Sequence, residues 1–138
     1  MAYRTIGKAL PRIEGEGKVT GQTKYAADLR FEDLLWAKVL RASVPHARIV
    51  KVDTAKAKTL KGVRAVLTGA DVKGIFVGTR VKDQPVLAYD KVRMCGAAVA
   101  AVAADSEDIA EEAIGLIDVE YEELPYVEIG RASCRERV

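Results

Sequence analysis

The sequence predicts an α+β fold in which a mixed sheet packs against one main helix and several short helices. Short apolar or alternating segments, typical of strands, are interspersed with short helical patterns, and no regular strand–helix–strand period recurs along the 138 residues. Apolar residues make up 49% of the chain and charged residues 30%, which is typical of a globular domain. Aromatic residues reach only 6%, so we expect a core of Ala, Val, Leu and Ile.

The first twenty residues predict an extended N-terminal arm, with the domain proper over residues 21–128. The arm is rich in Gly, Pro and charge and shows neither a helical nor a strand period. Gly15, Gly17 and Gly21 are spaced somewhat like a dinucleotide-binding loop. That loop must follow a strand and open a helix, and neither pattern is present here. We therefore expect the three glycines to form turns.

Three apolar segments in the first half of the domain predict strands: Leu34–Ala42, Ala47–Asp53 and Val63–Leu67. Pro45 separates the first two, because proline lacks the donor that a central strand needs. Asp53 or Thr54 can cap a short helix that runs to Lys58 or Leu60, and Gly62 is suited to close it.

The second half begins with a segment of no clear pattern, Gly74–Lys82, which we expect to be a loop, and a short strand over Pro85–Leu87. The small apolar run Ala97–Ala103 fits either a buried helix or a strand. Its β-branched residues and the polar stop at Asp105 favour a strand.

The strongest helical period follows that strand, over Glu107–Ile117, with Asp105 or Ser106 as its cap. Its apolar residues fall on one face: Ile109, Ala110, Ala113, Ile114 and Ile117. Alternation of polar and apolar residues over Asp118–Glu122 predicts the last strand.

Charge and composition exclude several classes of function. A net charge of +2 is too small to indicate a nucleic-acid surface. The longest apolar stretch, Met94–Ala104, is about half of the roughly 20 residues that span a bilayer, so we expect no membrane segment. Two cysteines and one histidine are too few for the usual zinc or cysteine-ligated iron–sulfur sites.

No catalytic residue emerges from the residues alone. Cys95 is expected to be a small core hydrophobe, and His46 a structural hydrogen-bonding group. Ser43, His46 and Asp53 lie on one short turn, which does not allow the geometry of a nucleophilic relay. The acidic pairs Glu111-Glu112 and Glu122-Glu123 point to different sides of their elements, so we expect solvated faces.

Short motifs in a fixed order carry the interpretation further: Ile6–Arg12, Lys18–Gly21, Tyr25–Leu29, Leu40–Ser43, Pro45–Ile49, Val66–Val72, Val99–Ala104 and Asp118–Pro125. Together they resemble the N-terminal α/β-hammerhead domain of the large, molybdopterin-binding subunit of the xanthine dehydrogenase/aldehyde oxidase family. The resemblance covers nearly all of Thr5–Val127. No single motif is specific, but their number and order are.

The resemblance implies a fragment of a cytoplasmic molybdenum hydroxylase, which oxidises aromatic heterocycles or aldehydes with water as the oxygen source. The molybdenum–molybdopterin centre would lie in other domains of the same subunit, and the 2Fe–2S clusters and usually FAD on partner domains or subunits. The fragment itself would hold no catalytic, cofactor or metal residue and would be inactive alone. Its role would be a scaffold that borders the substrate channel.

The resemblance also implies two residues near the substrate channel. In the family, the loop before the strand matching Pro85–Leu87 approaches the substrate funnel, and the corresponding residues here are Arg80 and Val81. Arg80 would favour an anionic substrate, although a plain solvated arginine is the alternative. Many members carry Glu and Pro where this chain has Ala97 and Ala98, so the branch of substrates is left open.

The last ten residues, Ile129–Val138, resemble the translation of a short-read sequencing adapter and are left out of the fold prediction. The alternative is a genuine basic tail. For the domain as a whole, the alternative to a hydroxylase fragment is a stand-alone structural or carrier-type binding module. Carrier domains present a lysine on a tight hairpin, and neither Lys18 nor Lys91 has that setting.

Overall fold

The computed structural model describes residues 5–127, so the predicted adapter segment Ile129–Val138 lies outside the described residues. The chain divides into two compact units, Met1–Leu34 and Leu35–Val138, and each is considered by itself. The predicted arm, residues 1–20, belongs to the first unit.

The first unit contains two short helical segments, α1 (Gly15–Val19) and the 3-10 turn η1 (Ala26–Asp28), and neither buries a residue. Part of the predicted arm is therefore helical. Lys18 Nζ lies 2.9 Å from Glu14 Oε2, one helical turn away, and this ion pair supports α1. The helix has only five residues, which is too few for a helical period to be visible in the sequence. No strand precedes α1 among the described residues, so the dinucleotide-loop arrangement is absent.

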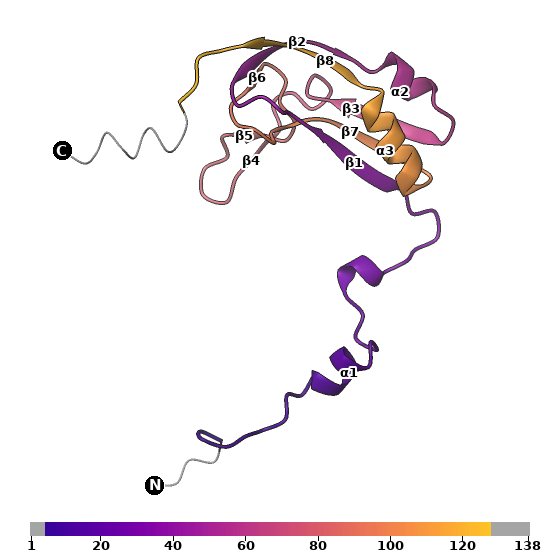
Figure 1. Cartoon of the computed structure of the whole chain (residues 1–138), viewed down its shortest axis with the longest axis vertical. Coiled ribbons are helices and arrows are strands. Elements are labelled where there is room, and N and C mark those ends of the chain that lie inside the picture. The colour runs from indigo at the N-terminus through magenta and orange to yellow at the C-terminus, as the bar shows by residue number, and fades with distance from the viewer. Residues whose placement is uncertain (1–4, 128–138) are drawn as a thin grey trace, which may run out of the picture. The chain divides into compact units, whose positions relative to one another are not determined.

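The second unit contains the strands and the longest helix (Figure 1). Its strands are β1 (Trp36–Arg41), β2 (Ala47–Asp53), β3 (Val63–Thr68), β4 (Phe76–Val77), β5 (Gln84–Pro85), β6 (Lys91–Val92), β7 (Ala98–Ala104) and β8 (Asp118–Glu123). Its helices are α2 (Ala55–Thr59) and α3 (Glu107–Gly115). The main helix ends two residues earlier than predicted, and β4 lies inside the segment predicted to be a loop.

The α+β class is confirmed, but the prediction of one mixed sheet is wrong. The strands form three sheets, ordered β1-β7-β3, β6-β2-β8 and β4-β5. Every strand pair of the described residues is antiparallel. The short helix α2 joins two strands of different sheets, so it makes no parallel crossover.

The core lies between the sheet β1-β7-β3 and the two helices, with β2 and β8 closing it. Ala100 and Val102 of β7 are buried against Ala113 of α3, Ile117 and Ala57 of α2. Among the described residues the buried core has no aromatic side chain, as the composition predicts. A second cluster of Ala42, Val92 and Val99 joins β6 to the start of β7.

The main helix begins where the sequence indicates. Ser106 has extended backbone, and its hydroxyl accepts a hydrogen bond from the Ile109 N–H at 3.3 Å. The preceding Asp105 receives the Arg64 guanidinium at 2.7 Å and donates its N–H to the Gly62 carbonyl at 2.9 Å. The start of α3 is thereby fixed to the start of β3.

Candidate functional site

The hairpin of β4 and β5 carries the two residues that the sequence associates with a substrate channel. Phe76 pairs with Pro85 and Val77 with Gln84, and the loop between them spans residues 78–83. A side chain on Gly78 would overlap the carbonyl oxygen of Val81, so only glycine allows the loop to close this tightly. The closure fixes the loop from which Arg80 projects.

Arg80 and Val81 lie at the tip of this hairpin. Both are exposed, and the exposed fraction of Val81 is 67%. No described residue forms an ion pair with Arg80. The hairpin therefore presents an uncompensated guanidinium beside an apolar side chain.

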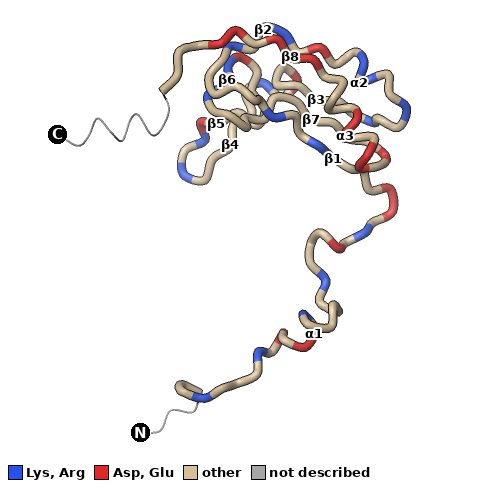
Figure 2. Tube along the Cα trace, viewed as in Figure 1, with Lys and Arg blue, Asp and Glu red and all other residues tan. Residues whose placement is uncertain are grey.

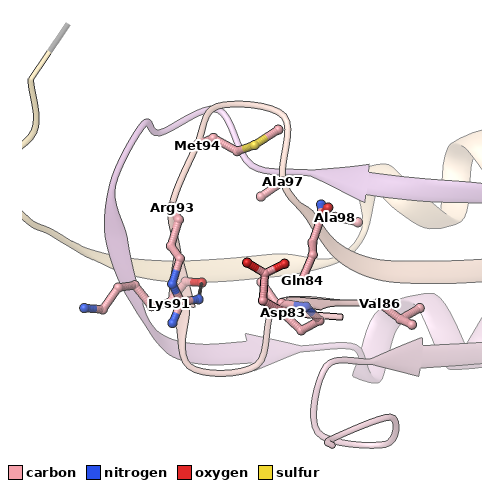
Figure 3. Close-up of a pocket in the computed structure, with 10 residues that line it drawn as sticks. Asp83, Gln84, Val86, Lys91, Arg93, Met94, Ala97 and Ala98 are labelled. Atoms are coloured by element: carbon pink, nitrogen blue, oxygen red, sulfur yellow. Dashed lines mark hydrogen bonds between the residues drawn. The ribbon is translucent and has the colours of Figure 1, made fainter. Parts of the chain in front are cut away.

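A small cavity of about 240 Å³ lies between β5, β6 and the first residues of β7 (Figure 3). Its apolar wall comes from Pro85, Val86, Ala88, Met94, Ala97 and Ala98. Its polar wall comes from Asp83, Gln84, Lys91 and Arg93. Arg80 and Val81 are not among the lining residues, so the sequence-predicted positions and the cavity occupy different parts of the hairpin region.

The charges around this cavity nearly balance. Arg93 pairs with Asp90, their atoms 3.5 Å apart, and donates to the Lys91 carbonyl at 3.3 Å. Lys91 and Asp83 have no ion pair among the described residues and carry opposite charges. Since ligand sites usually measure roughly 300–1,000 Å³, the cavity suits a small group at most.

The sequence pattern does not predict this cavity, although two of its wall residues are unusual for the family. Ala97 and Ala98 replace the larger residues that many members of the resembling family carry, and both line the cavity wall. Small side chains directly after the turn at Gly96, whose φ is +84°, leave this space open.

A second, more open hollow of about 720 Å³ lies beside the end of β8, and both His46 and Cys95 line it. His46 Nδ1 lies 2.8 Å from the Pro125 carbonyl oxygen, which confirms the predicted structural role. Asp53 instead accepts the Ala55 N–H and the Lys51 ammonium, each at 3.0 Å, and these bonds lower the pKa of its carboxyl. The relay of Ser43, His46 and Asp53 is not assembled.

The prediction that Cys95 is a core residue is wrong. Its thiol is free and exposed, and Sγ lies 3.8 Å from the Ala42 carbonyl oxygen and 3.6 Å from that of Ser43. The turn closed by the bond from Ala97 N–H to the Met94 carbonyl lifts Cys95 away from the sheet before β7 begins. By contrast, Glu111, Glu112, Glu122 and Glu123 are exposed as predicted.

Lys18 and Lys91, the lysines considered for a carrier role, lie in α1 and β6 and not on a tight hairpin turn. Within residues 5–127, no three His, Cys, Asp or Glu side chains gather as a possible metal site. The same residues contain no helix with the length and apolar character needed to cross a bilayer.

Residues 20–125 match the family model described as the aldehyde oxidase and xanthine dehydrogenase a/b hammerhead domain. This chain belongs to that family. The match confirms the predicted hammerhead domain and the family inferred from the order of short motifs.

Relatives within the family are close in sequence but much longer. The hammerhead chain is 52% identical over 125 residues to a probable xanthine dehydrogenase subunit of Bacillus subtilis, covering 90% of this chain and 17% of that protein. It is 46% identical over 123 residues to the nicotinate dehydrogenase large molybdopterin subunit of Eubacterium barkeri, covering 88% and 29%. The chain thus spans less than a third of either relative.

A solved structure also matches this chain over nearly all of its length and is itself much longer. Quinoline 2-oxidoreductase from Pseudomonas putida 86 superposes with a TM-score of 0.85 at 39% sequence identity. The superposition covers 99% of the hammerhead chain and 19% of the solved chain.

Proposed function

We propose that this hammerhead domain is a supporting part of the molybdopterin-binding subunit of a molybdenum hydroxylase. The reaction is the oxidative hydroxylation of an aromatic heterocycle or an aldehyde, with water as the oxygen source. The observation that carries the proposal is 52% identity over 90% of this chain to a relative of which it spans only 17%. Such close similarity over so small a share indicates a domain of a larger subunit.

The described residues do not fit a molybdenum–pterin group. The cavity beside β5 measures about 240 Å³, the larger hollow beside β8 is open to solvent, and within residues 5–127 no three His, Cys, Asp or Glu side chains gather as a metal site. Under the proposal the pterin and its molybdenum are held by other domains of the subunit, and the iron–sulfur clusters and flavin by partner domains or subunits. No chemical step is assigned to the residues of this chain.

Production of the complete subunit with its iron–sulfur and flavin partners tests this function. We expect bound molybdenum, substrate-dependent reduction of an electron acceptor, and oxygen-18 from labelled water in the product. The 138-residue chain alone is expected to give no turnover. Turnover by that chain with added cofactor would contradict the proposal.

The hairpin tip has a defined part in this proposal, because Arg80 is exposed without an ion pair among the described residues and Val81 is apolar and exposed. A free guanidinium at a channel entrance attracts an anionic substrate, and Val81 offers an apolar contact for the ring. In the complete enzyme, Arg80→Leu should lower kcat/KM for a substrate carrying a carboxylate by roughly tenfold at low salt. Turnover of a neutral substrate should change little.

Lys82→Leu is the matched control, because it removes the same charge from the same loop. An equal effect of both variants would indicate a general field and remove the specific role of Arg80. If Arg80→Leu leaves the preference between the charged and the neutral substrate unchanged, Arg80 has no role in substrate selection.

The proposal also places the subunit in the cytoplasm. This location follows from membership of the family, because the resemblance implies a cytoplasmic enzyme. Fractionation of the source cells tests the location, and activity confined to an external fraction would contradict it.

A further inference from the structure

The sheet β1-β7-β3 has one covered and one uncovered face. Val102 and Ala100 of β7 are buried in the core with Ala113 of α3, and Lys38, which pairs with Val102, reaches Glu107 of α3 at 2.8 Å. Ala101 and Ala103 alternate with these two β7 residues and point the opposite way, and neither is among the described residues that form the two core clusters. On that side Val39 and Leu67 remain 41% and 46% exposed.

Two rows of this face run across the three strands and contain no charged residue, while Arg41, the next outward residue of β1, lies at the end of the strand beyond them. Ala103 of β7 pairs with Ala37 of β1 and Ala65 of β3, and Ala101 pairs with Val39 and Leu67. An antiparallel sheet with one solvated face normally alternates apolar and polar residues. Here β7 is apolar at all seven positions, which is typical of a strand buried on both faces.

The sheet β6-β2-β8 of the same unit provides an internal comparison. Most of its outward positions are charged: Arg48 pairs with Glu122, their charged atoms 3.4 Å apart, and Lys51 faces Glu120 in the register. The exposed Val50, at the irregularity between Ile49 and Lys51, is the apolar exception. Figure 2 shows charged residues along β2 and β8, whereas β7 carries none. Two sheets in one small domain therefore have outer faces of opposite character.

The size of the apolar face decides between two occupants. With strands about 4.8 Å apart and a rise of about 3.4 Å per residue, six side chains cover on the order of 200 Å². A stable dimer needs roughly 800 Å² per partner, so a second copy would not be held by this face. A domain joined to it in the same chain meets no such limit, because linkage raises its effective concentration. The relatives are long enough to contain one, since this chain spans 17% and 29% of them.

We propose that the outer face of β1-β7-β3 is a docking face, on which another domain from the same large subunit packs through an apolar patch of its own. This inference rests on the proposed function and adds the face that makes the contact. The outer face of β6-β2-β8 then remains in water.

Cysteine labelling of the complete subunit tests this assignment. Leu67→Cys and Val50→Cys are introduced separately into a Cys95→Ser background, and maleimide uptake at each position is followed by peptide mass spectrometry. Val50 is the matched control, because it is a strand residue on the other sheet with an exposed fraction of 56% in this unit. Val39→Cys on the opposite edge strand repeats the test without altering Leu67.

We expect Leu67→Cys and Val39→Cys to react at least about tenfold more slowly than Val50→Cys in the native subunit, and equally fast after denaturation. Equal rates in an active, molybdenum-containing subunit would overturn the docking face and leave the proposed function standing. Protection that disappears on dilution would overturn it in favour of a second copy. Protection in a subunit that has neither molybdenum nor turnover would support the docking face and count against the proposed function.

Discussion

The Nδ1 atom of His46 lies 2.8 Å from the carbonyl oxygen of Pro125. A carbonyl only accepts hydrogen bonds, so Nδ1 carries the proton in this contact. The backbone reinforces the pair, because Leu124 donates its N–H to the His46 carbonyl at 2.9 Å. The single histidine of the chain therefore joins the start of β2 to the end of β8.

His46→Ala removes that side-chain bond and should lower the free energy of unfolding by about 1 kcal/mol. His46→Asn is the control, because its amide can donate from a position close to Nδ1. Urea denaturation measures both variants. Equal losses in the two would show that the hydrogen bond itself contributes nothing.

Gly62 is the position least tolerant of a side chain near the main helix. Its φ is +94°, and a Cβ there would lie 2.8 Å from Ile109 Cδ1. Gly62→Ala should therefore lower the free energy of unfolding by about 1–3 kcal/mol. Gly115→Ala, at the end of α3 with open space around it, should instead raise it by roughly 0.5–1 kcal/mol. Thermal melts giving both changes the same sign would contradict this reasoning.

The cap of α3 allows a similar comparison. Ser106→Ala loses the oxygen that accepts the Ile109 N–H and should lower the free energy of unfolding by about 1 kcal/mol. Ser106→Asp keeps an accepting oxygen and should remain near the original stability. If the aspartate variant is as unstable as the alanine variant, the cap is not the cause.

Acid should weaken the turn after β3 through Asp71. Its carboxylate accepts the Thr68 N–H at 2.7 Å and the Thr68 hydroxyl at 2.8 Å, and these bonds lower the pKa of Asp71. A carboxyl with a lowered folded pKa stabilises the fold above its unfolded pKa, about 3.9, and loses that contribution as pH falls through the folded value. The stability difference between the original chain and Asp71→Asn should therefore shrink below about pH 4. A difference that stays constant from neutral to acid pH would contradict the assignment.

The sequence predicted those features that local pattern determines. The bounds of β2 and the first residue of α3 agree with the predictions, because alternation and a capping serine act within a few residues. Pairing is different: Ala101 lies between Val39 and Leu67, which are distant in the chain, and no local pattern reports that register.

The candidate site residues likewise differ in whether the sequence could indicate them. Arg80 and Val81 were inferred from a family resemblance, and their placement in a substrate channel stays a prediction. The cavity wall at Ala97 and Ala98 depends on strands that converge only in the folded chain. The exposure of Cys95 depends on the turn at Gly96, whose positive φ was not inferred.

The central claim is that this hammerhead domain supports chemistry that other parts of a larger subunit perform. Sequencing of the genomic DNA beyond the codon for Glu128 tests it most directly. We expect a long in-frame continuation within the same family and no codons for Ile129–Val138. An in-frame stop directly after Val138 in the genomic DNA would contradict it.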